Sequence, residues 1–417
     1  MIARALYSLL WPLVRPLIKR YLRKRARQAP AYLEHWDERF GDALPQAGGE
    51  VIWLHAVSVG ETRAALPLLR QLQQRYPQAR FVITQMTPTG RATAQQLYPD
   101  AEVRYLPYDN ARVMRRFVAA LRPRCLILME TEIWPNLLHA CAQAGVPAFL
   151  VNARLSEKSL RGYRRIGALI RPALRQLRAI AAQSEADAAR LATLGAGNIR
   201  VCGNTKYDFT PPPAQLALGQ QFRERIGSRP VWLCASTRDG EEALILAAWR
   251  AAKVGDALLL LVPRHPERFA GVAALAAEQG FAVQRRSDQL PVSCETQVWI
   301  GDSMGELFGY YAAADVAFVG GSLLDFGAQN LIEPASIGVP VLLGPSTYNF
   351  AEASQLALAA GAARQVSDAG ELVALVLQLL ADAPQRAAMR DAGLAFTAQH
   401  RGASARIVAL LASQLDP

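Results

Sequence analysis

Short apolar runs rich in β-branched residues alternate with longer alanine- and leucine-rich stretches along most of the chain. Seven runs that we expect to be strands occupy residues 51–57, 81–86, 103–108, 125–130, 148–152, 179–183 and 199–202. Six more follow at residues 231–235, 257–262, 282–285, 298–300, 316–319 and 339–343. Because apolar strands separated by helices form parallel sheets covered on both faces, this pattern predicts an α/β protein with two doubly wound domains.

A proline-rich segment, Thr210-Pro211-Pro212-Pro213, separates the two series of strands. Proline has no backbone N–H and stiffens a linker, so we place a domain boundary there. The length of 417 residues also suits two domains rather than one. We expect an N-terminal basic segment at residues 1–30 and domains at residues 31–210 and 211–417, facing each other across a cleft.

The positive charge is concentrated at the N-terminus. Residues 1–30 contain eight basic side chains and no acidic one, so they account for +8 of the net charge of +11. The remainder is too sparsely charged for a nucleic-acid-binding protein, and we expect no nucleic-acid partner.

The same N-terminal segment is apolar but interrupted by Arg4, Pro12, Arg15 and Pro16. A membrane span needs roughly 20 unbroken apolar residues, and a secretory signal carries its basic residues before the apolar run. We therefore expect an amphipathic anchor that lies in the headgroup layer on anionic lipid, with the protein on the cytoplasmic side. A single span and an ordinary basic helix are the alternatives.

Several signatures of other protein classes are absent from the sequence. It contains no G-x-G-x-x-G after a strand, no G-x-x-x-x-G-K-[ST] and no D-x-D, so we expect neither a dinucleotide cofactor nor a metal. Five widely spaced cysteines without a C-x-x-C pair fit a reducing compartment rather than a disulfide framework or a zinc site.

Candidate catalytic residues follow the first predicted strand. Residues 55–61 end that strand and place Glu61 in the first turn of a helix expected at residues 61–74, with Ser58 and Gly60 in the same turn. A carboxylate there can accept a proton from a sugar hydroxyl. A first-turn glutamate is also favoured by the helix dipole, so a purely structural role is the alternative.

Polar residues also follow the later strands of the first half. Glu130 and Glu132 come just after a strand, where they can steady a proton network or ligate a metal. Lys206 precedes the proline segment, where it can offset phosphate charge. A basic stretch with Arg154, Lys158 and Arg161 suits a phosphorylated acceptor. Solvated loops and a solvated helix face are the alternatives.

In the second half, glycines, basic groups and carboxylates follow successive strands. Arg264 and His265 lie between two prolines, in a position that suits a phosphate or an exposed turn. Two further segments offer backbone N–H groups and carboxylates. The first comprises Met304, Gly305 and Glu306, and the second comprises Asn330, Leu331, Ile332 and Glu333. Such groups at the carboxyl ends of parallel strands are typical of a nucleotide-sugar site.

Taken together, these motifs resemble those of the bacterial 3-deoxy-D-manno-octulosonic acid (Kdo) transferases of the WaaA type. The resemblance rests on residues 55–61, 130–136, 152–156, 203–208, 263–268, 301–307 and 330–333, which occur in the family's order. It implies a GT-B fold with two Rossmann-like domains. It also implies inverting, metal-independent transfer of Kdo from CMP-Kdo to the lipid A precursor, lipid IVA, in lipopolysaccharide synthesis at the inner membrane.

The resemblance assigns roles to individual positions. Glu61 matches the family's catalytic base, and Glu130 and Lys206 match residues that support the transition state. The candidates of residues 264–265, 304–306 and 330–333 match CMP-binding positions, although Gln329 and Leu331 stand where some members have histidine and proline. Residues 31–210 would then bind the acceptor and residues 211–417 the donor.

Two other functions stay open from the sequence. One is another GT-B nucleotide-sugar transferase or epimerase with a different donor. The other is a non-catalytic protein of the membrane surface, which would bind in a salt-sensitive way through residues 1–30.

Overall fold

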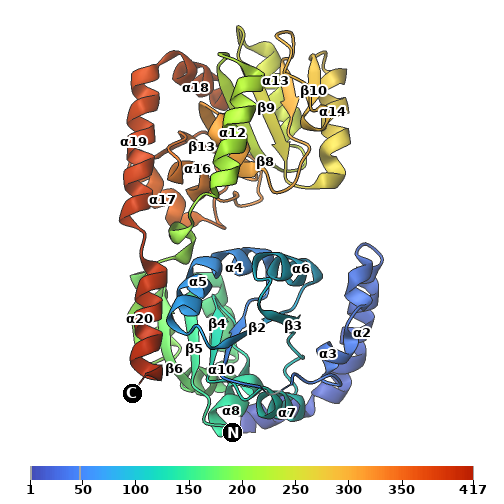
Figure 1. The fold of residues 1–417 in the computed structure, drawn as a ribbon, viewed down its shortest axis with the longest axis vertical. Coiled ribbons are helices and arrows are strands. Elements are labelled where there is room, and N and C mark those ends of the chain that lie inside the picture. Colours follow the sequence, from blue (N-terminus) through green and yellow to red (C-terminus); the bar gives the residue numbers. More distant parts are fainter. Residues whose placement is uncertain (1, 47, 417) are drawn as a thin grey trace. The chain divides into compact units, whose positions relative to one another are not determined.

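The computed structural model describes residues 2–46 and 48–416 (Figure 1). It divides the chain into two compact units, of which the first comprises residues 1–209 and 401–417 and the second residues 210–400. Each unit contains one parallel seven-stranded sheet with helices on both faces. The alternating pattern in the sequence predicted this architecture, because a parallel strand buried on both sides must be apolar throughout.

The first sheet has the strand order β3-β2-β1-β4-β5-β6-β7. Its strands are β1 (Val51–His55), β2 (Arg80–Gln85), β3 (Glu102–Tyr105), β4 (Cys125–Met129), β5 (Ala148–Ala153), β6 (Leu177–Ala182) and β7 (Ile199–Val201). All seven predicted strands of the first half are confirmed. β1 and β4, which carry the candidate motifs, pair directly at the centre.

Helices cover both faces of this sheet (Figure 1). One face packs against α4 (Val59–Ala64), α5 (Leu66–Arg75), α6 (Pro88–Leu97) and α20 (Ala403–Leu415). The other packs against α7 (Ala111–Leu121), α8 (Pro135–Gln143), α9 (Glu157–Arg165), α10 (Gly167–Leu174) and α11 (Glu185–Thr193). Adjacent residues of β1 show the alternation, because Trp53 belongs to one core and Leu54 to the other.

The second sheet has the order β10-β11-β9-β8-β12-β13-β14. Its strands are β8 (Val231–Thr237), β9 (Leu258–Pro263), β10 (Val283–Arg285), β11 (Val298–Ile300), β12 (Val316–Val319), β13 (Val341–Leu343) and β14 (Ala363–Gln365). The six predicted strands are confirmed and β14 was missed. Two of its three residues are exposed at the sheet edge, so its sequence lacks the apolar run from which a strand would be predicted.

The helices of the second unit also form two layers. One face packs against α12 (Pro213–Ile226) and α15 (Leu307–Ala313). The other packs against α13 (Glu241–Ala251), α14 (Phe269–Glu278), α18 (Ala369–Ala381) and α19 (Ala383–Gln399). Short α16 (Ile332–Ser336) and α17 (Ala351–Ala359) follow β12 and β13 in the chain.

The helix expected at residues 61–74 is in fact two helices, α4 and α5, so that prediction was wrong in detail. Pro67 lies in the first turn of α5 and has no N–H to continue the hydrogen-bond ladder of α4. A turn at Ala65 separates the two helices, while Leu69 N still donates to Ala65 O at 2.8 Å. Glu61 therefore belongs to a short, separately capped helix.

The last helix, α20, packs with the first unit, whereas we had placed residues 211–417 in one domain. Asp208 accepts hydrogen bonds from Gly402 N at 2.6 Å and Ser404 N at 2.5 Å, which fixes the start of the helix. Ile407 and Leu411 enter the core beneath β1. The sequence of an amphipathic helix predicts an apolar face but does not indicate which of two sheets that face packs against.

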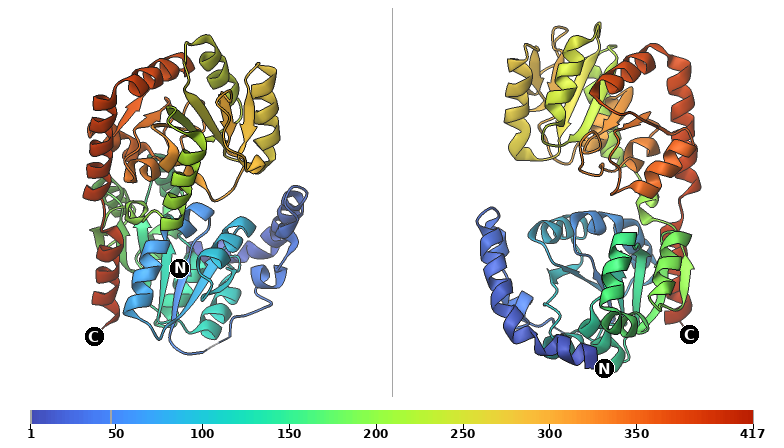
Figure 2. Two further views of the ribbon diagram at one scale, coloured as in Figure 1. Left: turned by 45° about the horizontal axis from the view of Figure 1, so that its top comes forward. Right: turned by 180° about the vertical axis from the view of Figure 1, so that it is seen from behind.

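The N-terminal segment forms α1 (Ile2–Leu9) and α2 (Trp11–Ala26), which run along the outside of the first unit (Figure 2). Arg15 and Lys19 of α2 lie over the ring of Phe40 in α3 (Trp36–Phe40), at 5.2 and 5.4 Å from its centroid. These cation–π contacts hold α2 beside the domain.

One face of the N-terminal helices is apolar and open to solvent. Its members, which we call the N-terminal apolar face, are 53% to 79% exposed and comprise Ile2, Leu6, Leu9, Leu10, Leu13 and Leu17. No single helix among residues 2–46 and 48–416 is long and apolar enough to cross a membrane. One pair of segments bent by 102°, Ala369–Ala381 with Ala383–Leu415, meets the length and composition of a span together.

Candidate active site

The candidate residues of the first unit gather at one edge of its sheet. All its strands are parallel, so the segments that follow β1, β4, β5 and β7 leave at the same edge. These segments carry Glu61, Glu130, Arg154 and Lys206. The topology thus brings together groups separated by up to 145 positions in the sequence.

Glu61 is fixed by a reciprocal cap at the start of α4. Its Oε2 accepts a hydrogen bond from Val57 N at 2.8 Å, and its Oε1 accepts one from Ser58 Oγ at 2.8 Å. Ser58 is the N-cap of α4 and its Oγ accepts from Glu61 N at 3.3 Å. These bonds cap the start of α4, so the structural and the chemical interpretation of Glu61 draw on the same geometry.

The surroundings raise the pKa of Glu61 to about 7. Burial is the main cause, and the negative charges of Glu130 and Glu132 add to it. The hydrogen bonds from Val57 and Ser58 oppose the shift because they favour the ionised form. A carboxyl group with a pKa near neutrality can exchange a proton in both directions, which suits a general base.

Lys206 lies directly beside one of these carboxylates. Its Nζ is 3.2 Å from Glu130 Oε1, and about four fifths of each side chain is shielded from solvent. Glu130 has a left-handed backbone with φ of 55°, which a non-glycine residue adopts at an energetic cost. Its N–H donates to Val151 O at 3.0 Å, so the strained turn is anchored to the neighbouring strand.

Asn152 holds the segment that carries Lys206. This buried residue, at the end of β5, also has a left-handed backbone, with φ of 50°. Its Oδ1 accepts from Thr205 N at 3.0 Å, and Asn204 Oδ1 accepts from Lys206 N at 3.0 Å. The position of Lys206 therefore depends on an amide of a strand two places away in the sheet.

Glu132 and His55 complete the cluster. We had considered Glu132 together with Glu130 but assigned the catalytic role to Glu130, and His55 was not among our candidate residues. Glu132 accepts a hydrogen bond from Trp134 Nε1 at 2.7 Å, and burial raises its pKa. His55 Nε2 lies 4.0 Å from Glu132 Oε2, but burial lowers the pKa of His55 to about 3. The imidazole is neutral, so this contact is no ion pair. The signal for Glu132 was its spacing from Glu130 after a buried strand.

The acceptor candidates occupy two segments of the same edge. Ser58 is the N-cap described above, and Gly60 is exposed with open space around it, since an added Cβ would meet only Ser58 Oγ at 3.8 Å. Arg154 is half-buried just after β5, while Lys158 and Arg161 project from the exposed side of α9. All three cations thus follow β5 in the chain, and within the described residues no hydrogen bond joins Lys158 or Arg161 to Glu61.

In the second unit, the segments after β9, β11 and β12 leave at one sheet edge. Arg264 follows β9, and its N–H donates to Thr237 O of the neighbouring strand at 3.0 Å. Burial lowers the pKa of His265, with contributions from Arg238 and Arg264. His265 is therefore neutral near pH 7, in a setting that is already cationic.

The turn after β11 is held by an ion pair. Arg286 Nε and Nη2 donate to the carboxylate of Glu306 at 3.1 and 3.2 Å, and Ser303 Oγ donates to it at 2.6 Å. Gly305 has φ of 81°, which explains the glycine, and Met304 is exposed. Glu306 thus shapes this turn through contacts with neighbouring side chains.

Polar groups of the segment after β12 bond to one another. Asn330 Oδ1 accepts from Ile332 N at 3.1 Å, and Asn330 Nδ2 donates to Glu333 Oε1 at 3.1 Å. The side chains of Leu331 and Ile332 are buried. The N–H of Ile332 is already bonded, so Asn330 and Glu333 are the polar side chains that this segment offers.

Glu241 supports the neighbouring turn and was not predicted from the sequence. This buried carboxylate accepts hydrogen bonds from the N–H groups of Gly321, Leu323 and Arg238 at 2.7, 2.9 and 2.8 Å. The glutamates after Gly240 offered the only signal, which is common at helix starts. Glu241 therefore fixes the Gly-Gly-Ser turn that leads to Asn330.

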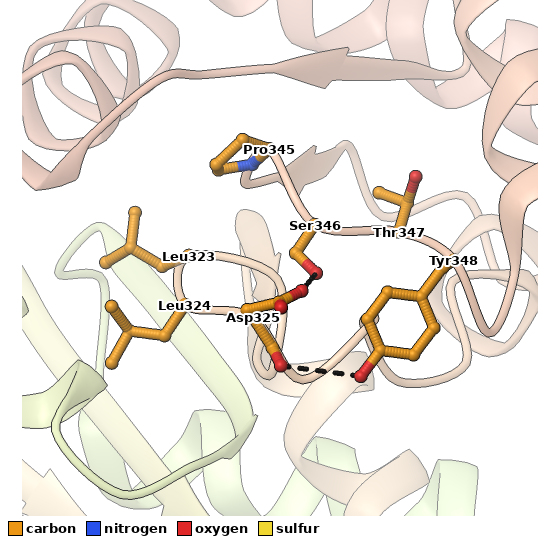
Figure 3. Close-up of a pocket in the computed structure, with 7 residues that line it drawn as sticks. All are labelled: Leu323, Leu324, Asp325, Pro345, Ser346, Thr347 and Tyr348. Atoms are coloured by element: carbon orange, nitrogen blue, oxygen red, sulfur yellow. Dashed lines mark hydrogen bonds between the residues drawn. The ribbon is translucent and has the colours of Figure 1, made fainter.

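A pocket of about 670 Å³ opens beside this turn (Figure 3). It is lined by Leu323, Leu324 and Asp325 on one side and by residues 345–348 on the other. Ser346 Oγ donates to Asp325 Oδ1 at 3.0 Å and Tyr348 OH to Asp325 O at 3.4 Å, as the dashed lines show. We had not named any of these residues as candidates.

No group of three or more His, Cys, Asp or Glu side chains among residues 2–46 and 48–416 has the arrangement of a metal site.

Comparison with known proteins assigns the family. Residues 34–209 match the family model described as 3-deoxy-D-manno-octulosonic-acid transferase (kdotransferase). The 3-deoxy-D-manno-octulosonic acid transferase of Bordetella pertussis is 43% identical over 97% of both chains, and that of Haemophilus influenzae is 38% identical over 99% of both.

Solved structures agree on the fold. A glycosyltransferase from Rickettsia africae has a TM-score of 0.61 at 12% identity, covering 88% of this chain and 99% of its own. A UDP-GlcNAc 2-epimerase from Neisseria meningitidis has a TM-score of 0.61 at 16% identity, covering 87% and 100%. These likenesses support a GT-B-like fold with two α/β domains. On the strength of its full-length relatives, the chain belongs to the 3-deoxy-D-manno-octulosonic acid transferases, a family of glycosyltransferases.

Proposed function

We propose that this protein transfers Kdo from CMP-Kdo to the lipid A precursor, with Glu61 as the general base. The observation that carries the proposal is the capped carboxyl group of Glu61, whose pKa is raised to about 7 at an edge that also holds Glu130 and Lys206. Family membership supplies the donor and acceptor classes. The hydrogen bonds to Val57 and Ser58 fix where Glu61 would meet a substrate hydroxyl.

In this mechanism the acceptor oxygen attacks the anomeric carbon of Kdo as the bond to CMP breaks, with inversion at that carbon. Glu61 takes the hydroxyl proton, and the electron pair of the broken bond leaves with the phosphate of CMP. Lys206, steadied by Glu130, contributes positive charge near the reacting groups. Ser58, Gly60, Arg154, Lys158 and Arg161 would bind the acceptor.

The donor would bind at the edge of the second unit. Arg264 and His265 would meet the phosphate, and the segments 304–306 and 330–333 would surround the rest of CMP. Glu333 is steadied by Asn330 and suits a ribose hydroxyl as an acceptor group. We further propose that residues 31–210 bind the acceptor and residues 211–400 the donor.

We also propose that α1 and α2 lie in the headgroup layer at the cytoplasmic face of the inner membrane. The N-terminal apolar face would enter the acyl boundary, and exposed basic residues such as Arg20, Lys24 and Arg27 would meet anionic lipid. This position would bring a lipid acceptor to the enzyme without a membrane span.

Mass spectrometry of the lipid product tests the proposed reaction. CMP-Kdo and tetra-acylated lipid A precursor are incubated with wild type or Glu61→Gln in the absence of added metal, alongside UDP-sugar donors. We expect a mass gain of one or more Kdo units with wild type, and a rate lower by on the order of 10²- to 10⁴-fold with Glu61→Gln. Undiminished transfer by the variant would remove Glu61 from the role of base.

The chain offers a matched control for loss of the helix cap. Glu371 lies in the first turn of α18 and accepts hydrogen bonds from Ser367 N and Ser367 Oγ, both at 2.7 Å, much as Glu61 accepts from residues 57 and 58. Glu371→Gln removes the same kind of cap in the second unit. We expect it to keep the wild-type rate, so a shared loss of activity would point to capping rather than catalysis.

A further inference from the structure

A cavity beneath the first helix collects cationic side chains that the proposed reaction does not use. It has a volume of about 400 Å³ and lies between α1, α7 and α8. Arg4, Arg115 and His139 line it, one from each helix, together with Ser8 and Asn136. Basic and hydrogen-bonding groups on the wall of one cavity suit an anion with several oxygen acceptors.

Asn136 fixes one wall of the cavity. Its Oδ1 accepts from Arg4 Nη1 at 3.2 Å and from Ser8 Oγ at 3.0 Å. The amide is buried, and its Nδ2 donates to Asp109 O at 2.7 Å while its N–H donates to Asp109 Oδ2 at 3.0 Å. Arg4 is therefore oriented before any ligand arrives, which lowers the entropic cost of binding.

The charge balance of the cavity is positive. Burial lowers the pKa of His139, and the positive charges of Arg4 and Arg115 lower it further. Burial also raises the pKa of Asp109, the acid behind this wall, to about 7, so its negative charge is incomplete near neutrality. Two arginines thus line the cavity, with one partly neutralised carboxyl group behind its wall, and an anion would complete the balance.

The cavity is continuous with the N-terminal apolar face. Leu9 lines the cavity and is also 71% exposed on that face. A ligand that fits both features has an anionic head and an apolar tail. We propose that the cavity binds the phosphate of an anionic phospholipid headgroup, while the acyl chains follow the N-terminal apolar face. This inference rests on the proposed membrane position of α1 and α2, and it does not depend on the chemistry of Glu61.

Neighbouring arginines on α7 provide the test. Arg115 and Arg116 are both exposed, but only Arg115 lines the cavity. Binding of the full chain is measured on vesicles of phosphatidylcholine alone and of equal parts phosphatidylcholine and phosphatidylglycerol. We expect Arg115→Ala to weaken binding to the mixed vesicles about fivefold or more, Arg116→Ala to change it little, and Arg115→Lys to restore part of it.

The outcomes separate this inference from the proposed transfer reaction. Equal losses in Arg115→Ala and Arg116→Ala would mean diffuse surface attraction and would overturn the cavity site. If inorganic phosphate at matched ionic strength released the wild-type protein from the mixed vesicles, the cavity would be assigned to free phosphate instead. Transfer to detergent-solubilised acceptor, measured on the same variants, should be unchanged in Arg115→Ala. A loss there would assign the cavity to the acceptor's own anionic group and overturn the phospholipid proposal.

If wild type bound neither kind of vesicle, the headgroup site and the membrane position would both fail. Kdo transfer in detergent would still report on the reaction itself. Leu6 and Leu13 belong to the N-terminal apolar face but do not line the cavity. The variants Leu6→Gln and Leu13→Gln should therefore weaken binding to both kinds of vesicle.

Discussion

Lys206 Nζ lies 3.2 Å from Glu130 Oε1, which joins the segment after β7 to the turn after β4. Both side chains are largely shielded from solvent, so their attraction is stronger than that of a surface pair. We expect Lys206→Ala to lower the rate of transfer by about 10²- to 10³-fold, as loss of a positioned charge does in other sites. Single-turnover kinetics measure this, and a wild-type rate would exclude Lys206 from the reaction.

Loss of the other partner should shift the pH dependence. Glu130 is one of the charges that raise the pKa of Glu61, so Glu130→Gln should lower that pKa. The acidic limb of the rate profile would then move to lower pH, even though the maximum rate also falls. A limb that stays in place would show that the charge of Glu130 does not reach Glu61.

The wild-type rate should itself depend on pH. Glu61 acts as a base only when it is ionised, and its pKa is raised to about 7, chiefly by burial. The rate should therefore be low well below pH 7 and rise as the pH passes through about 7. A profile of kcat/KM against pH tests this, with Glu371→Gln as the control that keeps the same limb. A rate that is flat from pH 5 to pH 8 would contradict the assignment.

Asn152 should matter for both stability and activity. Its side chain accepts the hydrogen bond of Thr205 N, and its left-handed backbone costs an alanine about 1 kcal/mol more than a glycine. We expect Asn152→Ala to lower the free energy of unfolding by about 2 to 4 kcal/mol and Asn152→Gly by less. Thermal melts separate the two. Both variants should lose activity, because each releases the segment of Lys206.

The sheets could be predicted because each strand carries its own signal. β9, Leu258–Pro263, is buried at every position, and its run of leucines predicts a buried strand from the sequence alone. The place of Glu61 in the first turn of a helix was predicted in the same way, because the apolar run before it ends at residue 57. Local chemistry fixes these features, so the sequence alone suffices.

Long-range partners could not be predicted in the same way. The residues around Lys206 do not indicate that its partner is Glu130, because Glu130 lies 76 positions earlier in the chain. Helix α20 shows the same limit, because its apolar side suits either sheet and Asp208 decides the outcome. Glu241 resembled any first-turn glutamate until the fold placed the turn of residues 321–324 above it. Such features depend on topology rather than on local pattern.

Substitution of Glu241 tests whether its carboxylate supports the turn of residues 321–324. Its carboxylate accepts the N–H groups of Gly321, Leu323 and Leu324, at 2.7, 2.9 and 3.4 Å. In Glu241→Gln one oxygen becomes an NH₂ group that faces these donors, so at least one N–H loses its partner at a cost of about 1 to 3 kcal/mol. The turn should then hold the donor less well.

We expect the KM for CMP-Kdo to rise about tenfold or more in Glu241→Gln, as one lost buried hydrogen bond implies, while kcat at saturating donor changes less. Glu224→Gln, on the exposed side of α12 in the same unit, is the control and should alter neither constant. Calorimetry with CMP alone separates the two effects. If kcat fell while CMP bound normally, Glu241 would act on the reaction rather than on the turn that receives the donor.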